Sequence, residues 1–570
     1  MPAAHVAELV IYFGIVLLLM VPLGRYMARV YQGEVWLARW LGPLERILYK
    51  VAGVDPAAEQ PWYRYAAQLL VFQLVSGLGL YAILRLQQFL PLNPQRLGPL
   101  PPAVAFNTAV SFLTNTNWQA YSGEAQLSYF SQMALIVQQF VSPAVGLAVA
   151  VALFRGIARQ SSKTIGNFYR DLVRGLLYVL LPLVIPFALL LSWQGVPQSL
   201  APYHPVTTVQ GQVQQIPGGP AAAMTSIMMI GSNGGGYFGA NNADPLENPS
   251  ALSNLIVWVM ILLVPFATVF TYGEMVGSRR QAWTIFAVML TVLLAGFALT
   301  WNSSRAVGPR LAALPVRSSS GNMVGVEERF GPFLSSLYLP ATTGVSNGSV
   351  NSAFDSANPV AGMVALADLM LGCITPGGDG AGMYGILFHV LFIVFLAGLM
   401  VGRTPEFLGK KISIREAKLV MIGLLITPVA ILLLAAPAAV LPASLASVSN
   451  PGPHGLSQIL YAYSSGVANN GSAFGGFGAA LPYSAIMVGV AMFLGRYLII
   501  LPALAIAGSL AAKTSAPVTA GTLPTSGWMF GLLLLSSVLV VAGLSFFPAL
   551  ALGPVAEHFA LWAGQLFPLH

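Results

Sequence analysis

The sequence predicts an all-α integral membrane protein in which four loops meet around one central pore. Two observations set the class, since 56% of the 570 residues are hydrophobic and only 8% are charged, whereas a soluble globular domain carries about 25% charged residues. The third observation is a spacing: polar loops recur at intervals of 117, 114 and 123 residues, counted from Asn117 through Gly234, Gly348 and Gly471. A chain this poor in charge cannot cover a water-facing surface, so it spans a membrane.

The same composition excludes several other classes. The net charge of +8 does not indicate nucleic-acid binding, because the basic residues lie in short loops between apolar runs. Cys373 is the only cysteine, which excludes a disulfide within the chain and a metal cluster built from cysteines. Met1 to Glu8 contains no Lys or Arg, so we expect no cleavable signal peptide before the first apolar run.

Ten apolar runs are each long enough to cross a bilayer as a helix, which takes about 20 residues. They are 6–28, 64–86, 130–154, 172–193, 254–274, 283–301, 380–402, 416–440, 483–507 and 527–549. A further apolar stretch, 359–375, is separated from 380–402 by Pro376-Gly377-Gly378-Asp379-Gly380. We interpret these two pieces as one broken membrane element, since such breaks are tolerated where the freed backbone is buried or faces a wet cavity.

Lys and Arg predict the orientation, because they accumulate on the cytoplasmic side of membrane proteins. With the N-terminus outside, nineteen of the 26 Lys and Arg lie in the inward loops and their flanks, six lie outside, and Arg496 lies within a helix. Four of the outer six are Arg305, Arg310, Arg317 and Arg329, so the bias is weaker there. The sequence therefore predicts extracytoplasmic N- and C-termini and four polar loops that face the same side.

Helices two to nine pair around the polar loops in the order helix, loop, helix, four times. A stretch too short to span precedes each loop: 104–113, 221–230, 333–343 and 456–465. A re-entrant helix followed by an extended loop fits this order. We therefore expect four pseudo-repeats between two extra end helices. The predicted boundaries are 1–60 for the first helix and its loop, 61–160, 161–278, 279–402 and 403–512 for the repeats, and 513–570 for the last helix.

The residue types in the loops suit a dehydrated monovalent cation, whose water shell can be replaced by backbone carbonyl oxygens. Glycine permits the unusual dihedrals that point successive carbonyls inward, and Asn beside it tolerates the left-handed region. No acidic residue occupies the glycine position, which disfavours a carboxylate ring. Acidic residues lie just beyond, at Glu124, Asp244, Glu247 and Asp355, where they are expected to enrich cations in an outer vestibule.

Several motifs resemble the potassium-binding subunits of the Kdp family of bacterial potassium-transporting ATPases. They are the loops Thr114-Asn115-Thr116-Asn117-Trp118-Gln119, Ser232-Asn233-Gly234-Gly235-Gly236-Tyr237-Phe238, Ser346-Asn347-Gly348-Ser349-Val350-Asn351 and Asn469-Asn470-Gly471-Ser472-Ala473-Phe474, with Gly402-Arg403-Thr404-Pro405-Glu406, Leu408-Gly409-Lys410-Lys411, Asn450-Pro451-Gly452-Pro453-His454-Gly455 and Pro548-Ala549-Leu550-Ala551-Leu552-Gly553-Pro554. The similarity extends over essentially the whole chain.

The resemblance implies a membrane subunit that selects K⁺ from the extracytoplasmic side of the bacterial inner membrane and passes it through an intramembrane tunnel. The expected filter residues are Thr116, Asn117, Asn233, Gly234, Asn347, Gly348, Asn470 and Gly471, which would hold K⁺ by their backbone carbonyls. The expected partners are a P-type ATPase catalytic subunit, a third accessory subunit, a small single-helix subunit and membrane lipids. The chain itself has no Asp-Lys-Thr-Gly phosphorylation motif and no nucleotide-binding Gly-x4-Gly-Lys-Ser/Thr loop, so we expect no ATP site and no catalysis within it.

Three polar residues near the loops each have a functional interpretation and at least one structural alternative. Arg496 would either repel or steer a cation below the filter, as the resemblance implies, or snorkel to the inner interface or form a structural ion pair. Asp379 marks a gating loop or a water-exposed helix-end cap. Gln119 lies beside the ion path or makes a simple hydrogen bond within the loops. Gly235 and Gly236 are alternatively explained by close helix packing.

The first loop departs from the pattern because Asn117 stands where the other loops carry glycine, and a shifted register would align Thr116 instead. Two rival functions stay open. One is a stand-alone potassium channel or symporter of the superfamily of potassium transporters, to which the resemblance also assigns this chain; the two extra helices and the Kdp-like motifs disfavour it. The other is a secondary transporter with broken helices, which four equivalent loops fit poorly.

Overall fold

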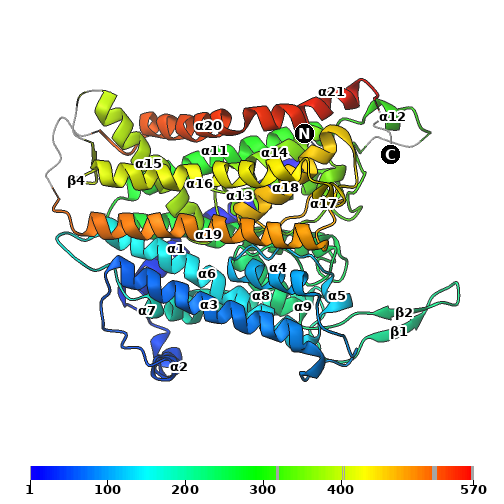
Figure 1. The fold of residues 1–570 in the computed structure, drawn as a ribbon, viewed down its shortest axis with the longest axis horizontal. Helices are drawn as coiled ribbons and strands as arrows, with labels where there is room; N and C mark the ends of the chain where they lie inside the picture. Colours follow the sequence, from blue (N-terminus) through cyan, green and yellow to red (C-terminus); the bar gives the residue numbers. More distant parts are fainter. Residues whose placement is uncertain (1, 316–319, 401, 403–404, 516–522, 566–570) are drawn as a thin grey trace.

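The computed structural model describes residues 2–315, 320–400, 402, 405–515 and 523–565. Within these residues ten helical spans are long and apolar enough to cross a membrane, and they run side by side as one bundle (Figure 1). They are α1 (Ala3–Gln32), α3 (Trp62–Leu86), α6 (Tyr129–Ala158), α7–α8 (Phe168–Trp193), α10 (Ala251–Met275), α11 (Arg279–Ser304), α15 (Ala381–Met400), α16 (Ile414–Ala438), α19 (Pro482–Ala511) and α20 (Trp528–Leu550). Each corresponds to one predicted apolar run, so the all-α membrane fold is confirmed.

Two spans contain a π-helical stretch. The fourth runs from α7 (Phe168–Arg174) through η2 (Gly175–Leu180) into α8 (Leu181–Trp193), and the tenth continues from α20 through η5 (Ala551–Val555) into α21 (Ala556–Trp562). In each case a proline follows or interrupts the stretch, at Pro182 and Pro554. Proline lacks the N–H that an α-helical bond needs, so the backbone bond pattern changes locally.

Four shorter helices enter the bundle without crossing it. They are α4 (Pro102–Leu113), α9 (Ala221–Ile230), α13 (Gly331–Val345) and α18 (Gly452–Val467). At 1.5 Å per residue a helix of this length is shorter than the roughly 30 Å of hydrocarbon. Each has a long helix before it and another after it, and each contains one of the short apolar stretches that the sequence predicts as re-entrant. The predicted repeat boundaries themselves stay a prediction.

The predicted break in the seventh span is present. Ten residues of non-helical backbone, 371–380, separate α14 (Pro359–Met370) from α15. This segment is buried within the protein, with Thr375 1% exposed and Asp379 3% exposed. Protein contacts therefore replace the lipid that irregular backbone cannot face.

The centre of the bundle differs from its edges in burial. α6 and α10 have 89% of their most apolar window buried, whereas α1 and α20 have 17% and 22%. The central helices pack on all sides against other helices, and α1 packs along α10. The first and last spans therefore lie at the periphery, where their apolar side chains remain available to lipid.

Two small hairpins stand at opposite ends of the bundle (Figure 1). β1 (His204–Thr207) pairs antiparallel with β2 (Val213–Ile216) and projects beyond the end that also holds the start of α1 and helix α21. β3 (Glu406–Phe407) pairs with β4 (Lys410–Lys411) at the other end. The Lys410 ammonium donates to the carbonyl oxygens of Gly156 (3.0 Å), Leu510 (2.8 Å) and Arg159, so it neutralises the partial negative charge where α6 and α19 end.

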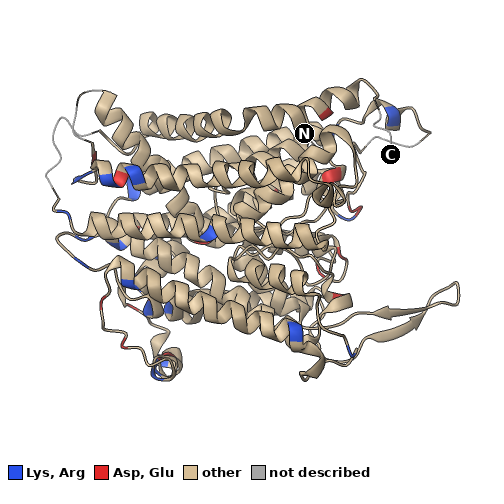
Figure 2. Cartoon of the chain, in the orientation of Figure 1, with Lys and Arg blue, Asp and Glu red and all other residues tan. Residues whose placement is uncertain are grey.

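Charge is distributed unevenly between the two ends. Lys and Arg gather at the end that carries β3 and β4, while several Asp and Glu lie beside the loops at the opposite end (Figure 2). This agrees with the asymmetry used for the orientation, which stays a prediction. Arg317, Arg403 and Thr404 lie outside the described residues.

The remaining short elements connect the spans. They are α2 (Ala38–Val51), η1 (Gln87–Phe89), α5 (Gly123–Gln126), η3 (Asn241–Ala243), α12 (Pro309–Ala312), η4 (Phe354–Ser356) and α17 (Pro442–Leu445).

Candidate functional site

The loops that follow the four short helices share one hydrogen bond. The N–H groups of Thr116, Asn233, Asn347 and Asn470 each donate to the carbonyl five residues earlier, at 2.8–3.0 Å. These four residues are therefore structurally equivalent, which places Asn117 in the position of Gly234, Gly348 and Gly471. The N–H groups of Asn117 and Gly348 each donate in addition to the carbonyl six residues earlier in their own loop. The register of the first loop is thus the one in which Asn117, not Thr116, takes the place of glycine.

Each loop begins with a residue in the left-handed region. Asn115, Ser232, Ser346 and Asn469 have φ of 69°, 49°, 69° and 53°. Two residues later φ is again positive at Asn117 (52°), Gly348 (76°) and Gly471 (90°), whereas the second loop has its second positive value at Gly235 (73°). In a strand successive carbonyls alternate in direction. Residues with positive φ interrupt that alternation, and Asn and Gly adopt them at the least cost.

The four loops meet backbone to backbone. A methyl group on Gly234 would lie 2.6 Å from the carbonyl oxygen of Asn470 and would overlap that of Thr116. A methyl group on Gly348 would overlap the Asn470 carbonyl oxygen, and one on Gly471 would overlap that of Thr116. Glycine is therefore required sterically at three of the four equivalent positions, and carbonyl oxygens occupy the place where the loops converge.

Side-chain amides tie the loops into a closed ring. Each of the four contacts between neighbouring loop segments includes at least one hydrogen bond from an Asn. These are Asn117 Nδ2 to Asn233 Oδ1 (2.7 Å), Asn347 Nδ2 to the Met228 carbonyl (3.1 Å), Asn470 Nδ2 to the Thr342 carbonyl (3.0 Å) and Asn469 Nδ2 to Thr116 Oγ1 (3.0 Å). Every Asn in this set is nearly or fully buried, so each broken bond would leave an unpaired polar group.

The oxygen atoms that the ring could offer to an ion are uncharged. Its residues carry no carboxylate, and the described residues contain no group of three His, Cys, Asp or Glu that could hold a metal ion. Divalent cations in proteins are usually held by carboxylates or imidazoles. A ring of carbonyl oxygens instead suits a monovalent cation that has lost its water shell.

Gln119 links the first two loops just beyond the ring. Its Nε2 donates to the Gly236 carbonyl at 2.5 Å, and its Oε1 accepts from the Gly236 N–H at 3.1 Å. This is the hydrogen-bonding alternative from the sequence, whereas a place beside the ion path stays a prediction. A methyl group on Gly235 would lie 2.7 Å from the Asn117 carbonyl oxygen, so this glycine is required by contact between loops.

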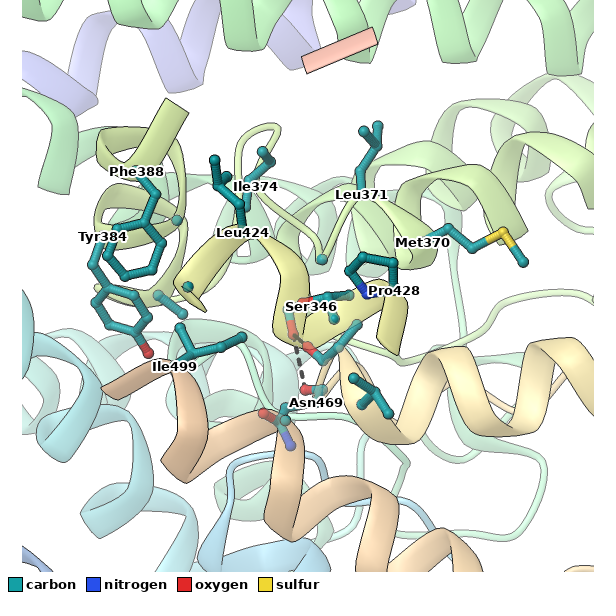
Figure 3. A pocket seen from close by; sticks show the side chains of 18 of the residues that line it. Ser346, Met370, Leu371, Ile374, Tyr384, Phe388, Leu424, Pro428, Asn469 and Ile499 are labelled. Atoms are coloured by element: carbon teal, nitrogen blue, oxygen red, sulfur yellow. Dashed lines mark hydrogen bonds between the residues drawn. The ribbon is translucent and has the colours of Figure 1, made fainter. Parts of the chain in front are cut away.

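A cavity of about 70 Å³ lies next to the ring, more space than one water molecule needs. Asn115, Ser346 and Asn469 line it from the loops, and in Figure 3 a hydrogen bond from the Ser346 hydroxyl reaches the Asn469 carbonyl (2.8 Å). The opposite part of its wall comes from α15, α16 and α20. Tyr384 and Phe388 stand on one side of Ser346 in this view.

Asp379 and Arg496 both line this cavity. Asp379 is 3% exposed and accepts from Ser232 Oγ at 2.9 Å, while its Oδ2 has no hydrogen-bond partner among the described residues. The interpretation as a water-exposed helix cap is therefore wrong, because the segment between α14 and α15 folds inward. Arg496 is 4% exposed near the middle of α19 and donates to the Ser142 carbonyl at 3.0 Å.

Two alternatives for Arg496 conflict with this geometry. A snorkelling side chain would reach the end of the bundle, but the guanidinium lies beside the cavity. Within the described part of the chain no carboxylate lies within 4 Å of it, so it forms no close ion pair there. The cavity thus contains one acidic and one basic side chain that are not directly bonded to each other.

One expectation for the outer vestibule is wrong. Glu247 is fully buried, and its Oε2 accepts the N–H groups of Tyr237 (3.0 Å) and Phe238 (3.2 Å). Burial raises the pKa of Glu247 to about 8, although these hydrogen bonds act in the opposite direction. The side chain holds the backbone that follows Gly236 and does not face a vestibule. The sequence shows Glu247 only as one acidic residue in a polar loop, which carries no signal of burial.

The sequence also does not single out the left-handed residues at the start of each loop. Ser232, Ser346 and Asn469 connect the ring to the cavity, yet two of them are Ser and one is Asn. The signal that would have found them is position: each stands one residue before the Asn of an Asn-Gly step.

A comparison with protein families matches residues 10–559 to the family described as Potassium-transporting ATPase A subunit. A Potassium-transporting ATPase potassium-binding subunit from Rhodospirillum centenum is 54% identical over 569 residues, covering 100% of this chain and 99% of the relative. Its counterpart from Pseudomonas aeruginosa is 53% identical over 561 residues, covering 98% and 99%. Among solved structures, the potassium transporter TrkH from Vibrio parahaemolyticus has a TM-score of 0.50 at 16% identity, covering 76% of this chain and 84% of that one. That likeness concerns the fold.

Proposed function

Because the chain belongs to the family of potassium-transporting ATPase A subunits, we propose that its four loops select K⁺ and deliver it to an ATP-hydrolysing partner subunit. The observation that carries the proposal is the closed ring, in which carbonyl oxygens of Thr116 and Asn470 meet at Gly234, Gly348 and Gly471. A dehydrated K⁺ needs such oxygens in place of water.

The selectivity of this ring follows from its rigidity and its neutrality. Glycine at three positions lets the backbones approach, and the Asn amides fix their separation by hydrogen bonds. A cage held in this way favours the ion whose size matches the distance between its oxygens. Because no carboxylate is present in the ring, the electrostatic attraction is too weak to compensate for stripping water from a divalent ion.

The cavity provides the next step. An ion that leaves the ring on the inner side enters a space lined by Asp379 and Arg496. We propose that the Arg496 guanidinium disfavours direct passage along the pore axis, since a like charge in a low-dielectric site repels strongly. The ion would then leave sideways between α15, α16 and α20, whose side chains form the far wall.

Delivery requires a partner, because the sequence contains neither a phosphorylation motif nor a nucleotide-binding loop of the P-loop type. The relatives are named as potassium-binding subunits of an ATPase. The proposed complex contains a P-type catalytic subunit, a third accessory subunit and a small single-helix subunit. It lies in the bacterial inner membrane with both termini of this chain on the extracytoplasmic side.

Co-expression with the neighbouring genes, followed by purification through a tag on this chain, tests the proposal. The expected result is a complex whose ATP hydrolysis rises with K⁺, more than with Na⁺ or Rb⁺. The chain reconstituted alone in liposomes should conduct no K⁺. Rapid K⁺ flux through the chain alone, without K⁺-stimulated hydrolysis by the complex, would instead favour the stand-alone channel or symporter.

A further inference from the structure

Helix α2 stands apart from the bundle. It follows α1 after a short turn and contacts α7 and η2 on one side. In Figure 1 the spanning helices run across the view, whereas α2 is seen almost along its own axis. Its axis is therefore roughly perpendicular to theirs, which is the direction of a helix that lies in the plane of a membrane.

One side of α2 is fixed to the bundle. Tyr49 is 8% exposed, and its hydroxyl donates to Glu45 Oε1 at 2.9 Å. The hydroxyl of Tyr178 in η2 donates to Glu45 Oε2 at 2.6 Å, and Arg174 of α7 lies 3.5 Å from the same carboxylate. The only acidic residue of α2 is thus used for docking, and the rotation of the helix about its axis is determined.

The opposite side of α2 is apolar and exposed. Trp40, Leu44, Ile47 and Val51 are 69%, 42%, 57% and 82% exposed. Their spacing of four, three and four residues places them in one row along the helix. Trp36, just before α2, is also largely exposed. A row of large apolar side chains in contact with water is costly, so we expect this row to be covered in the membrane-bound protein.

A third side carries three cations. Arg39, Arg46 and Lys50 are exposed and lie on one face, next to the apolar row. The guanidinium carbon of Arg39 lies 5.3 Å from the ring centre of Trp40. Among the described residues, no carboxylate lies within 4 Å of these three side chains.

We propose that α2 is an interfacial anchor that lies on the inner leaflet and binds the phosphate groups of anionic phospholipids. The apolar row enters the boundary between headgroups and acyl chains, and Arg39, Arg46 and Lys50 contact the phosphates. Trp beside Arg is typical of this depth, because the indole ring is apolar with one polar edge. The choice of the inner leaflet rests on the proposed orientation, whereas the lipid contact rests on the three faces of the helix.

A reporter on the apolar row tests this proposal. Ile47→Cys is labelled with an environment-sensitive fluorophore in the intact complex, and the complex without this substitution, in which Cys373 is buried, gives the background labelling. The complex is placed in vesicles of phosphatidylcholine, with or without phosphatidylglycerol, that contain lipids brominated near the headgroup. We expect quenching of the label in both, about twofold stronger when phosphatidylglycerol is present.

The charge face is tested by a triple variant with a matched control. Arg39→Gln, Arg46→Gln and Lys50→Gln together should remove the dependence on phosphatidylglycerol. The matched control removes the same number of positive charges at exposed sites at the start of α11 and α16, by Arg280→Gln, Arg415→Gln and Lys418→Gln. This control should retain the dependence of quenching on phosphatidylglycerol. A label that remains in water in both membranes would overturn the proposal. So would a label that bromine reaches in the isolated chain but not in the complex, because a partner subunit would then cover α2.

Discussion

The third and fourth loops of the ring are near copies of each other, whereas the first and second form a dissimilar pair. In the copies, positive φ occurs at Ser346 and Gly348 and again at Asn469 and Gly471. The hydroxyl groups behind them also correspond: Tyr338 bonds Ser349 at 2.5 Å, and Tyr461 bonds Ser472 at 2.7 Å. The third and fourth loops thus have the same backbone conformation and the same hydrogen bond from a tyrosine to a serine behind it.

The first and second loops are joined by side chains instead. Asn117 replaces glycine and bonds Asn233, while Gln119 bonds Gly236 in both directions. In the second loop Gly234 has no positive φ, and Gly235 has it instead. A shared Asn-Gly sequence therefore does not guarantee a shared backbone, because contacts with the neighbouring loop decide which glycine takes the left-handed conformation.

The first and second loops also provide the hydrogen bonds to the charged residues of the cavity. Ser232 of the second loop bonds Asp379, and Arg496 bonds the carbonyl of Ser142. The hydroxyl of Ser142 in turn donates to Asn115 of the first loop at 2.7 Å. All four loops reach the cavity or the residues that line it, but only the first and second are joined by hydrogen bonds to its two charged residues: Ser232 directly to Asp379, and Asn115 through Ser142 to Arg496.

The largest effect on K⁺ activation is expected when glycine is replaced in the third and fourth loops. Gly348→Ala and Gly471→Ala each force a side chain into a positive φ and into a carbonyl oxygen. We expect about a hundredfold weaker activation by K⁺, since strain and overlap together cost about 2–3 kcal/mol. Gly234→Ala meets only the overlap and should cost about tenfold. The measurement is K⁺-stimulated ATP hydrolysis of the complex, with Rb⁺ as competitor.

Gly277→Ala is the control, because Gly277 also has positive φ (72°) but nothing lies within 4 Å of an added methyl group. Equal losses at Gly277 and Gly348 would show that backbone strain alone explains the result and would contradict the role of the ring.

The next effect concerns the exit. Arg496→Met removes the positive charge from the cavity while retaining much of the side-chain volume. We expect the ratio of K⁺ transported to ATP hydrolysed to fall on the order of tenfold, which corresponds to about 1.4 kcal/mol. Arg415→Met, at an exposed site, should leave the ratio unchanged. Unchanged K⁺ affinity and unchanged coupling in Arg496→Met would remove Arg496 from the mechanism.

A smaller effect is expected from Asn117→Gly, which makes the glycine set complete but removes the bond to Asn233. A hydrogen bond of this kind contributes about 1 kcal/mol, so K⁺ activation should weaken about fivefold and discrimination against Rb⁺ should decrease. Asn241→Gly is matched for positive φ (55°) outside the ring and should have little effect. Tighter K⁺ binding in Asn117→Gly would mean that the asymmetry is incidental.

The smallest effect on K⁺ activation is expected from Glu247, whose burial instead makes the stability of the fold depend on pH. Because burial raises its pKa from 4.5 to about 8, the folded protein binds a proton between these values that the unfolded chain does not. Stability from this group is thus fully present below about pH 4.5 and is lost as the pH rises toward 8. Melting temperatures measured from pH 5 to 8 should show this slope. Glu247→Gln should flatten it, whereas Glu124→Gln should retain it. Equal slopes in both variants would contradict the assignment.

The sequence predicts the ten spans, the four short helices and the break before α15 because apolar length and helix-breaking residues are local properties. It also predicts that the Asn-Gly steps converge, and the close backbone contacts of Gly234, Gly348 and Gly471 agree with this. It does not predict that Gly235 rather than Gly234 takes positive φ, or that Glu247 is buried. The conformation of Gly235 depends on its contact with the first loop, more than a hundred residues away in the sequence. The burial of Glu247 depends on how its polar loop folds back on Tyr237 and Phe238. Neither contact can be read from the residues next to these positions.

Thallium, which replaces K⁺ in size and charge, provides the most direct test of the ring. Anomalous diffraction from crystals of the complex grown in Tl⁺ would locate the ion. We expect a principal peak where the carbonyl oxygens of Thr116 and Asn470 meet Gly234, Gly348 and Gly471, and loss of this peak in Gly348→Ala. A principal peak beside Asp379 in the cavity, with none inside the ring, would contradict this expectation.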